Sequence, residues 1–277
     1  KTFTNKELLS EKGYCVLPAM IREDLNALNK LASSFEELIP TNERQANYIT
    51  HWHHNIEAKL KLADELKDLL LPYLSEYFEG FRLVCPNIIY KYPGEDTEFY
   101  MHQDWPYVDE YFFSSYNIWI PLQDVTEANG GLYLVPGSHI SHNDPVRGPD
   151  PLYPDYTDIA KKTPAIPINV KAGETIIFAT NMLHGSPSNT SKATRISIAG
   201  GLVAACTPLT MYKKVEHSEL IAQYHLSDDS IMRYNNIRKE SGELEPPNSS
   251  LIRYILPPGQ PFAKPEAKPL GADKRQE

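Results

Sequence analysis

The feature that most constrains this chain is a series of short β-rich segments after Gly80, separated by proline, glycine and polar turn residues. Such segments lie at 83–92, 116–122, 131–135, 166–170, 175–179 and 195–202. Many short strands with turn signals between them are typical of a β-barrel or a β-sandwich. We therefore predict a core that is built from strands.

The part of the chain before Gly80 is predicted to be mainly helical. Within 21–39 and 56–78, leucine and phenylalanine recur three or four residues apart, which places them on one face of a helix. Pro72 is expected to kink or split the second of these helices. A short helix that ends at Gly13 and a strand at 14–18 are predicted before them.

These elements are expected to form one domain over residues 1–256. We predict a helical part at 1–80, the β core at 81–205 and then a C-terminal helix region, with a helix around 218–224. Residues 257–277 are rich in proline, lysine and alanine and are predicted to be a flexible tail. The proline-rich stretch at 143–164 is predicted to be a long ordered loop over one end of the barrel.

Charge and composition exclude several classes of protein. With 27 basic and 36 acidic residues, the formal net charge is −9, which gives the surface as a whole no attraction for nucleic acid or an anionic membrane. The sequence contains no stretch of 18 apolar residues, so no membrane-spanning segment is predicted. Three widely spaced cysteines argue against a disulfide framework and a zinc site. We therefore expect a cytoplasmic protein whose partner is a small molecule, and the oligomeric state stays open.

The sharpest local motif is Met101-His102-Gln103-Asp104. In an extended segment, residues i and i+2 point to the same face, so His102 and Asp104 converge while Gln103 points away. An imidazole and a carboxylate on one face offer two ligands to a divalent first-row metal ion. Taken alone, the motif is more often a hydrogen-bonded pair than a metal site.

A third candidate ligand, His184, follows the apolar strand at 175–179. After a polar turn comes a strand on which Arg195, Ser197 and Ala199 share one face, and we expect a hairpin with His184 on one arm and Arg195 on the other. Two histidines and one carboxylate make up the facial triad of non-haem Fe(II) oxygenases, which leaves coordination positions open. An arginine inside a barrel can hold a distal carboxylate in a bidentate fork. The alternative for this arginine is a surface salt bridge.

In the order and spacing of these motifs, the sequence resembles the phytanoyl-CoA dioxygenase family of Fe(II)/2-oxoglutarate-dependent oxygenases. The resemblance runs from about Gly13 to Leu202. It rests on His102-Gln-Asp104, Asn129-Gly-Gly-Leu-Tyr-Leu-Val-Pro136-Gly-Ser-His139, His184-Gly-Ser186 and Arg195. The resemblance implies a double-stranded β-helix, the jelly-roll or cupin-like fold, as an all-β core with flanking helices.

The resemblance also implies roles for individual residues. His102, Asp104 and His184 would bind Fe(II), while the cosubstrates would be 2-oxoglutarate and O2. Arg195 would pair with the far carboxylate of 2-oxoglutarate, with Ser186 beside it. The remaining implied positions are Trp119 and Asn87 in the cosubstrate pocket, and His139 in a structural turn.

The substrate side of the site is less constrained by sequence. Trp105 and Tyr107 follow Asp104 closely enough to overlook a bound metal, and the resemblance places Trp52 and His53 where loops cover the substrate. Arg147 and the prolines around it are candidates for a lid. Three histidines within 51–54 have a spacing that suits no single metal site; the simpler interpretation is a helix cap with exposed imidazoles.

The sequence thus predicts a 2-oxoglutarate-dependent dioxygenase that hydroxylates an unactivated C–H bond of a small or medium metabolite. Succinate and CO2 would be released. Desaturation, cyclisation and epoxidation need the same cofactors and stay open. A non-redox cupin-type metal enzyme and an inactive binding module are further alternatives, but Arg195, Ser186 and the complete triad favour the oxygenase.

Overall fold

The computed structural model describes residues 5–148, 156, 163–215, 217–233 and 249–255. Its helices are α1 (Asn5–Glu11), α2 (Arg22–Glu36), η1 (Thr41–Glu43), η2 (Thr50–Trp52), α3 (Ile56–Ser75) and α4 (Ser138–Ser141). Its strands are β1 (Tyr14–Leu17), β2 (Asn47–Ile49), β3 (Phe81–Lys91), β4 (Phe99–His102), β5 (Ser115–Pro121), β6 (Tyr133–Leu134), β7 (Ile166–Pro167), β8 (Thr175–Ala179), β9 (His184–Ser186), β10 (Arg195–Ala204), β11 (Leu209–Lys214), β12 (Ile221–Leu226) and β13 (Ser250–Ile255).

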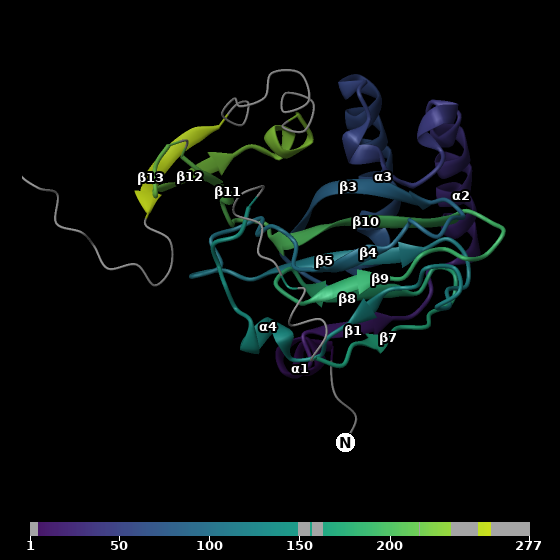
Figure 1. Ribbon diagram of the computed structural model, residues 1–277, viewed down its shortest axis with the longest axis horizontal. Coiled ribbons are helices and arrows are strands. Elements are labelled where there is room, and N and C mark those ends of the chain that lie inside the picture. Colours follow the sequence, from purple (N-terminus) through teal and green to yellow (C-terminus); the bar gives the residue numbers. More distant parts are fainter. Residues whose placement is uncertain (1–4, 149–155, 157–162, 216, 234–248, 256–277) are drawn as a thin grey trace, which may run out of the picture.

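Two antiparallel sheets form the β core (Figure 1). The larger has the strand order β1-β8-β5-β10-β3-β2, and the smaller has the order β4-β9-β6-β7. Apolar side chains from both sheets, among them Trp119, Leu134 and Phe178, pack into one cluster between them. Two antiparallel sheets whose strands cross from one to the other make the double-stranded β-helix, so the fold class expected from the sequence is confirmed.

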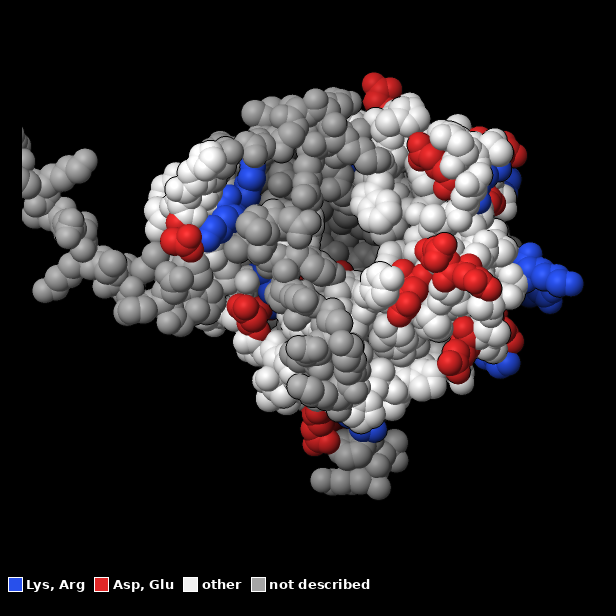
Figure 2. All heavy atoms as spheres, in the orientation of Figure 1, with Lys and Arg blue, Asp and Glu red and all other residues white. Residues whose placement is uncertain are grey.

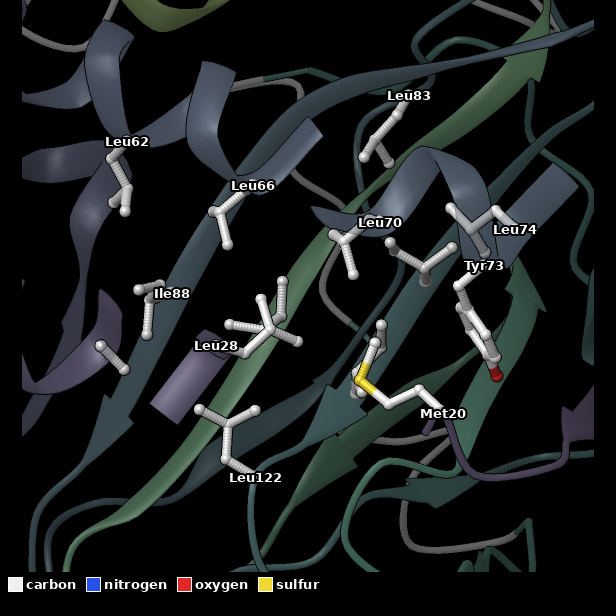
Figure 3. Packing of buried hydrophobic residues seen from close by; sticks show 14 of the residues in the cluster. Met20, Leu28, Leu62, Leu66, Leu70, Tyr73, Leu74, Leu83, Ile88 and Leu122 are labelled. Atoms are coloured by element: carbon white, nitrogen blue, oxygen red, sulfur yellow. The ribbon is translucent and has the colours of Figure 1, made fainter. Parts of the chain in front are cut away.

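Helices α2 and α3 cover the outer face of the larger sheet (Figure 1). The leucine spacing noted in the sequence explains this packing, because Leu62, Leu66 and Leu70 occupy one face of α3 and point toward the strands (Figure 3). Leu28 of α2 and Ile88 of β3 belong to the same cluster. This layer makes the larger sheet a rigid support for side chains on its inner face.

The helix predicted around Pro72 is not split. α3 runs without interruption from Ile56 to Ser75, and Pro72 lies three residues before its end with an exposed side chain. A proline so near the end removes one main-chain hydrogen bond, and the packed apolar face of the helix outweighs that loss.

The helix predicted around 218–224 is wrong, since β12 occupies 221–226 in a third, three-stranded sheet of order β11-β12-β13. β12 pairs antiparallel with β11, with Tyr212 opposite Gln223. All but one residue of β12 is buried, and this burial between strands overrides the weak helical preference of a short segment.

The other expectations are met unevenly. β8 coincides with the predicted strand at 175–179, while β6 and β7 are shorter than the segments predicted at 131–135 and 166–170. Most of the predicted loop at 143–164 and the tail at 257–277 lie outside the described residues. Within the described part of the chain, no helix is both long enough and apolar enough to cross a membrane.

Candidate metal centre and its cavity

Three side chains from the smaller sheet and its edge converge at one point. His102 ends β4, Asp104 follows two residues later and His184 begins β9, where it lies opposite His102 in the strand register. One ligand atom from each residue lies within 4.8 Å of the other two. The predicted triad is therefore brought together by the pairing of β4 with β9.

The two imidazoles present the same nitrogen to this point. Nδ1 of His102 lies 2.6 Å from the carbonyl oxygen of Tyr100, and Nδ1 of His184 lies 2.9 Å from that of Met182. A carbonyl oxygen only accepts, so Nδ1 of each ring carries the hydrogen and Nε2 keeps its lone pair. Both Nε2 atoms face the Asp104 carboxylate, at 3.7 Å for His102 and 3.5 Å for His184.

Burial favours the neutral form of His184. Desolvation, together with the nearby His102 imidazole, lowers its pKa to about 4. A neutral imidazole with a free Nε2 is the form in which histidine binds a metal ion. No proton has to be removed from Nε2 of His184 before this ring can act as a ligand at neutral pH.

The Asp104 carboxylate and main chain are held from three sides. Asn117 on β5 donates its amide to Oδ2 at 2.7 Å. The main-chain nitrogen of Asp104 donates to Thr180, and its carbonyl accepts from Nε of Arg147 at 3.0 Å. Metal-binding carboxylates are commonly fixed by such secondary hydrogen bonds. The carboxylate is therefore oriented toward the two imidazoles.

Gln103 points away from the ligands, as an extended segment requires. Its amide nitrogen donates to the carbonyl oxygens of His142 and Asn181, and its oxygen accepts from the hydroxyl of Tyr156. These bonds tie the ligand segment to the loops beneath it. The side chain is 1% exposed, so its role is to anchor rather than to line the site.

The three ligands lie in a cavity of about 550 Å³ between the two sheets, and Figure 2 shows a hollow at the centre of one face of the molecule. Its wall includes Asn87, Trp119, Ser186 and Arg195, the residues that the family resemblance places around a cosubstrate. Trp52, Trp105 and Tyr107, the candidates for the substrate side, also line the cavity.

Arg195 reaches the cavity from β10 and has an unusual environment. It is 2% exposed, its Nη1 donates to the Ser197 hydroxyl at 2.5 Å, and its guanidinium lies 5.2 Å from the centre of the Trp119 ring. Its Nε is buried without a hydrogen-bond partner, and no carboxylate of the described chain lies within ion-pair distance. Burial lowers the pKa of Arg195 to about 9, so it stays charged at neutral pH. The salt-bridge alternative for this residue does not apply.

Other residues singled out in the sequence lie elsewhere. His53 is absent from the described cavity wall; it is buried, and its Nδ1 lies 2.7 Å from the Tyr48 hydroxyl, while the neighbouring His51 does line the cavity. Arg147 is 1% exposed and pairs with Glu110 at 2.7 Å, below the metal ligands. Arg147 itself is therefore fixed in a buried ion pair, while most of the proline-rich stretch around it lies outside the described residues.

The predicted hairpin between His184 and Arg195 is wrong. β9 pairs with β4 and β6 in the smaller sheet, whereas β10 pairs with β3 and β5 in the larger one. The turn after Ser186 crosses from one sheet to the other. Within it, Asn189 forms isolated β-bridges to Gly94 and Asn129, which lead the chain away from β9. Both side chains line the cavity, each from a different sheet.

Two site residues were missed in the sequence. Asn117 lies two positions before Trp119, on the same face of β5, so strand alternation could have identified it. Lys91 lies at the end of β3, on the face that carries Asn87 and Ile89, and its Nζ donates to the Ser186 hydroxyl at 2.5 Å. The signal available in the sequence was that this lysine continues the apolar inner face of a strand.

The donor set fits a divalent first-row metal ion. Two imidazole nitrogens and one carboxylate are the mixed ligands that Fe(II) takes in facial-triad sites. Ligand atoms about 2.1 Å from one ion and at right angles to each other stand about 3.0 Å apart. The histidines lie 3.7 and 3.5 Å from the two oxygens of Asp104, and one ligand atom from each of the three residues lies within 4.8 Å of the others, so the ligands would have to move closer together around an ion.

Comparison with known families agrees with this geometry. A family model described as phytanoyl-CoA dioxygenase (PhyH) matches residues 9–197. Phytanoyl-CoA dioxygenase domain-containing protein 1 of Danio rerio is 28% identical over 179 residues, which cover 57% of this chain and 57% of that protein. Phytanoyl-CoA dioxygenase 1 of Oryza sativa subsp. japonica is 27% identical over 144 residues, 46% of this chain and 48% of that protein. The chain thus spans about half the length of the curated relatives it matches.

Solved structures share the fold. The epimerase SnoN, in complex with Fe3+, alpha ketoglutarate and nogalamycin RO, superposes with a TM-score of 0.56 at 16% identity, covering 73% of this chain and 82% of that one. The non-heme alpha ketoglutarate dependent carbocyclase SnoK gives 0.53 at 19% identity, with 76% and 87% covered. HygX from Streptomyces hygroscopicus, with nickel and 2-oxoglutarate bound, gives 0.50 at 17% identity, with 74% and 88% covered.

Proposed function

The chain belongs to the phytanoyl-CoA dioxygenase family, and from this premise we propose that it is an Fe(II)- and 2-oxoglutarate-dependent dioxygenase acting on a small or medium metabolite. The observation that carries the proposal is one cavity that holds both a three-ligand metal centre and a buried arginine without a counter-charge. A dicarboxylate that chelates the metal at one end needs a cation at its other end. Arg195 is placed to supply that cation.

Each side chain of the cavity has a defined task in this scheme. His102, Asp104 and His184 bind Fe(II) on one side, so the opposite side stays open to ligands. When bound, Fe(II) with 2-oxoglutarate and O2 supplies the oxidant, one oxygen atom going to the substrate and the other to succinate, with CO2 released. Ser186 and Trp119 flank the arginine and limit how the chain of 2-oxoglutarate lies.

The substrate is proposed to be uncharged and largely apolar. Among the described residues that line the cavity, Arg195 is the one lysine or arginine, and the distal carboxylate claims it. The rest of the wall includes Trp52, Trp105, Met211 and Ile231. Acidic side chains gather beside the hollow in Figure 2, which disfavours a polyanion such as a coenzyme A thioester. The family name therefore does not transfer as a substrate assignment.

Hydroxylation is the outcome we propose; a buried metal site of this kind would hold one C–H bond of the substrate near the ion and limit the access of water. The fold itself permits other outcomes, since the similar structures include proteins named as an epimerase and a carbocyclase. The choice depends on where the substrate C–H bond lies, which residues such as Trp105 and Tyr107 would set.

The test is succinate release from 2-oxoglutarate by the Fe(II)-loaded protein across a library of neutral metabolites. We expect slow release without substrate, faster release with a true substrate, and sharply reduced release from Asp104→Ala. Mass spectrometry of the product distinguishes a gained oxygen atom from the loss of two hydrogens. A wild-type protein that neither binds nor consumes 2-oxoglutarate under any of these conditions would contradict the proposal.

A further inference from the structure

Two buried cations lie on neighbouring strands at the cavity, and one of them, Arg195, is part of its wall. Lys91 on β3 is directly opposite Arg195 on β10 in the strand register, and both side chains are 2% exposed or less. Among the described residues, no carboxylate lies within ion-pair distance of either one. Two like charges taken out of water without a counter-charge are costly, so the pair indicates a place for an anion.

The position of the lysine ammonium is tightly determined. Its Nζ donates to the hydroxyl of Ser186 at 2.5 Å and to the carbonyl of the same residue at 3.3 Å, and it lies 5.1 Å from the centre of the Phe99 ring. The aliphatic stem passes over Gly130, where an added Cβ would stand 2.6 Å from Cδ of the lysine. The ammonium therefore has little freedom to turn elsewhere.

This contact fixes the direction of the Ser186 hydroxyl. An ammonium group only donates hydrogen bonds, so the hydroxyl oxygen of Ser186 must accept from Lys91. The single hydrogen of that hydroxyl is then directed away from Lys91. Because Ser186 lines the cavity, the hydroxyl is available there as a donor to an anionic oxygen.

We infer that Lys91 is a positioning residue for the distal carboxylate of 2-oxoglutarate: it acts through Ser186, whose hydroxyl it sets as a donor, and it adds a second positive charge behind Arg195. The inference rests on the proposed function, because it takes 2-oxoglutarate as the ligand. It predicts that Lys91 selects for a 2-oxo acid with a second carboxylate.

The experiment measures binding rather than turnover, with the Fe(II)-loaded protein under anaerobic conditions. Isothermal titration gives the Kd of 2-oxoglutarate and of 2-oxopentanoate, in which a methyl group replaces the distal carboxylate. Lys91→Met should reduce the preference for 2-oxoglutarate by about tenfold or more, the effect of losing a charge-assisted hydrogen bond. It should leave the affinity for 2-oxopentanoate within about twofold, and Lys91→Arg should retain more of the preference.

The matched control is Lys59→Met. Lys59 is also fully buried, and its Nζ donates to the carbonyl oxygens of His51 and Met232, away from Ser186. This variant should lose stability but keep the wild-type preference for 2-oxoglutarate. In addition, Lys91→Met should reduce the preference for 2-oxoglutarate less in a Ser186→Ala background than in the wild type, because the two residues act as a unit.

The outcomes separate the two proposals. If the wild-type protein does not bind 2-oxoglutarate, the proposed function fails. Suppose that the wild type binds 2-oxoglutarate and that Arg195→Met loses this binding. If Lys91→Met then keeps the full preference for 2-oxoglutarate over 2-oxopentanoate, only the inference about Lys91 is overturned. Should Lys91→Met fail to fold, Lys91→Arg and Lys91→Gln are titrated in its place: a preference for 2-oxoglutarate that is lower in Lys91→Gln than in Lys91→Arg supports the inference, and equal preferences contradict it.

Discussion

At the scale of single residues, the site is organised by hydrogen bonds that decide which atom faces the cavity. Main-chain carbonyls hold the Nδ1 atoms of His102 and His184, so the Nε2 atoms point to the metal position. Asn117 restrains one oxygen of Asp104. These hydrogen bonds restrain the ligand side chains before a metal ion binds, which is the basis of a preorganised site.

The Asn117 contact leads to a prediction about metal affinity. Asn117→Ala removes the hydrogen bond to Oδ2 of Asp104 and lets the carboxylate rotate, so Fe(II) should bind about 10- to 100-fold more weakly. Anaerobic competition with a chelator measures the affinity. Asn29→Ala, on the outer helix α2, is the control and should bind Fe(II) like the wild type. Equal affinity for Asn117→Ala would show that the carboxylate is held by its main chain alone.

Lys91 gives a prediction about pH. The pKa of Lys91 is lowered to about 7, mainly by burial and to a smaller extent by repulsion from Arg195, while Glu98 acts in the opposite direction. The free protein thus carries the charge fully only below pH 7, whereas a bound dianion raises the pKa and restores it. The affinity for 2-oxoglutarate should therefore fall as pH rises from 7 to 8.5, by up to about tenfold per pH unit. Titrations across this range should show the slope in wild type and a flat profile in Lys91→Met; a slope in both would assign it to another group.

At the scale of elements, the centre depends on how closely β9 lies between its neighbours. Gly185 sits between a metal ligand and Ser186, and a Cβ there would stand 2.3 Å from the Tyr133 hydroxyl and 2.6 Å from the Phe99 carbonyl. β9 pairs with β4 and β6 in this region, so neither neighbour can withdraw without breaking a strand pair.

Gly185→Ala should accordingly lower the free energy of unfolding by about 1–3 kcal/mol, and it should weaken Fe(II) binding because His184 moves with the strand. Denaturant unfolding and metal competition measure the two effects. Gly94→Ala is the matched control, since a Cβ there would make an ordinary contact of 3.4 Å with Thr97. If Gly185→Ala behaved like Gly94→Ala, the tight packing of β9 would be refuted.

Elements were predictable from sequence where the pattern was local. The strand at 175–179 and the leucine face of α3 follow from neighbouring residues, and they were found. β12 was predicted as a helix, because its strand character comes from pairing with β11 and β13, which a short segment does not encode alone. The supposed hairpin failed for a similar reason, since a polar turn does not reveal that the chain changes sheets after Ser186.

The residues of the site were likewise predictable only where the sequence pattern was local. His102 and Asp104 could be paired from their spacing, and His184 and Arg195 from the order of motifs. Lys91 could not be placed by such means, because its meaning depends on Ser186, which comes from the opposite sheet.

At the scale of the whole molecule, the two sheets divide the work. The smaller sheet and its edge supply the three metal ligands and Ser186, while the larger sheet supplies Lys91 and Arg195. A ligand that chelates the metal and reaches the arginine would span the space between them. Helices α2 and α3 pack on the outer face of the larger sheet, and Figure 3 shows leucines of this layer between helix and strands.

This division explains how an acidic chain can hold a dicarboxylate. The net charge of −9 is spread over the surface, whereas two cations are enclosed where no carboxylate of the described chain pairs with them. A small dianion that enters gains their attraction in a buried setting, while a large polyanion would also extend over the outside of a negatively charged protein. Metal and dicarboxylate are therefore expected to bind together in one cavity.

The most direct test is an anaerobic titration of 2-oxoglutarate into wild-type protein and Asp104→Ala, each with and without Fe(II). We expect one 2-oxoglutarate per chain, bound much more tightly by the wild type when Fe(II) is present, and loss of that enhancement in Asp104→Ala. An affinity for 2-oxoglutarate that is the same with and without Fe(II), or an enhancement that survives in Asp104→Ala, would contradict the claim.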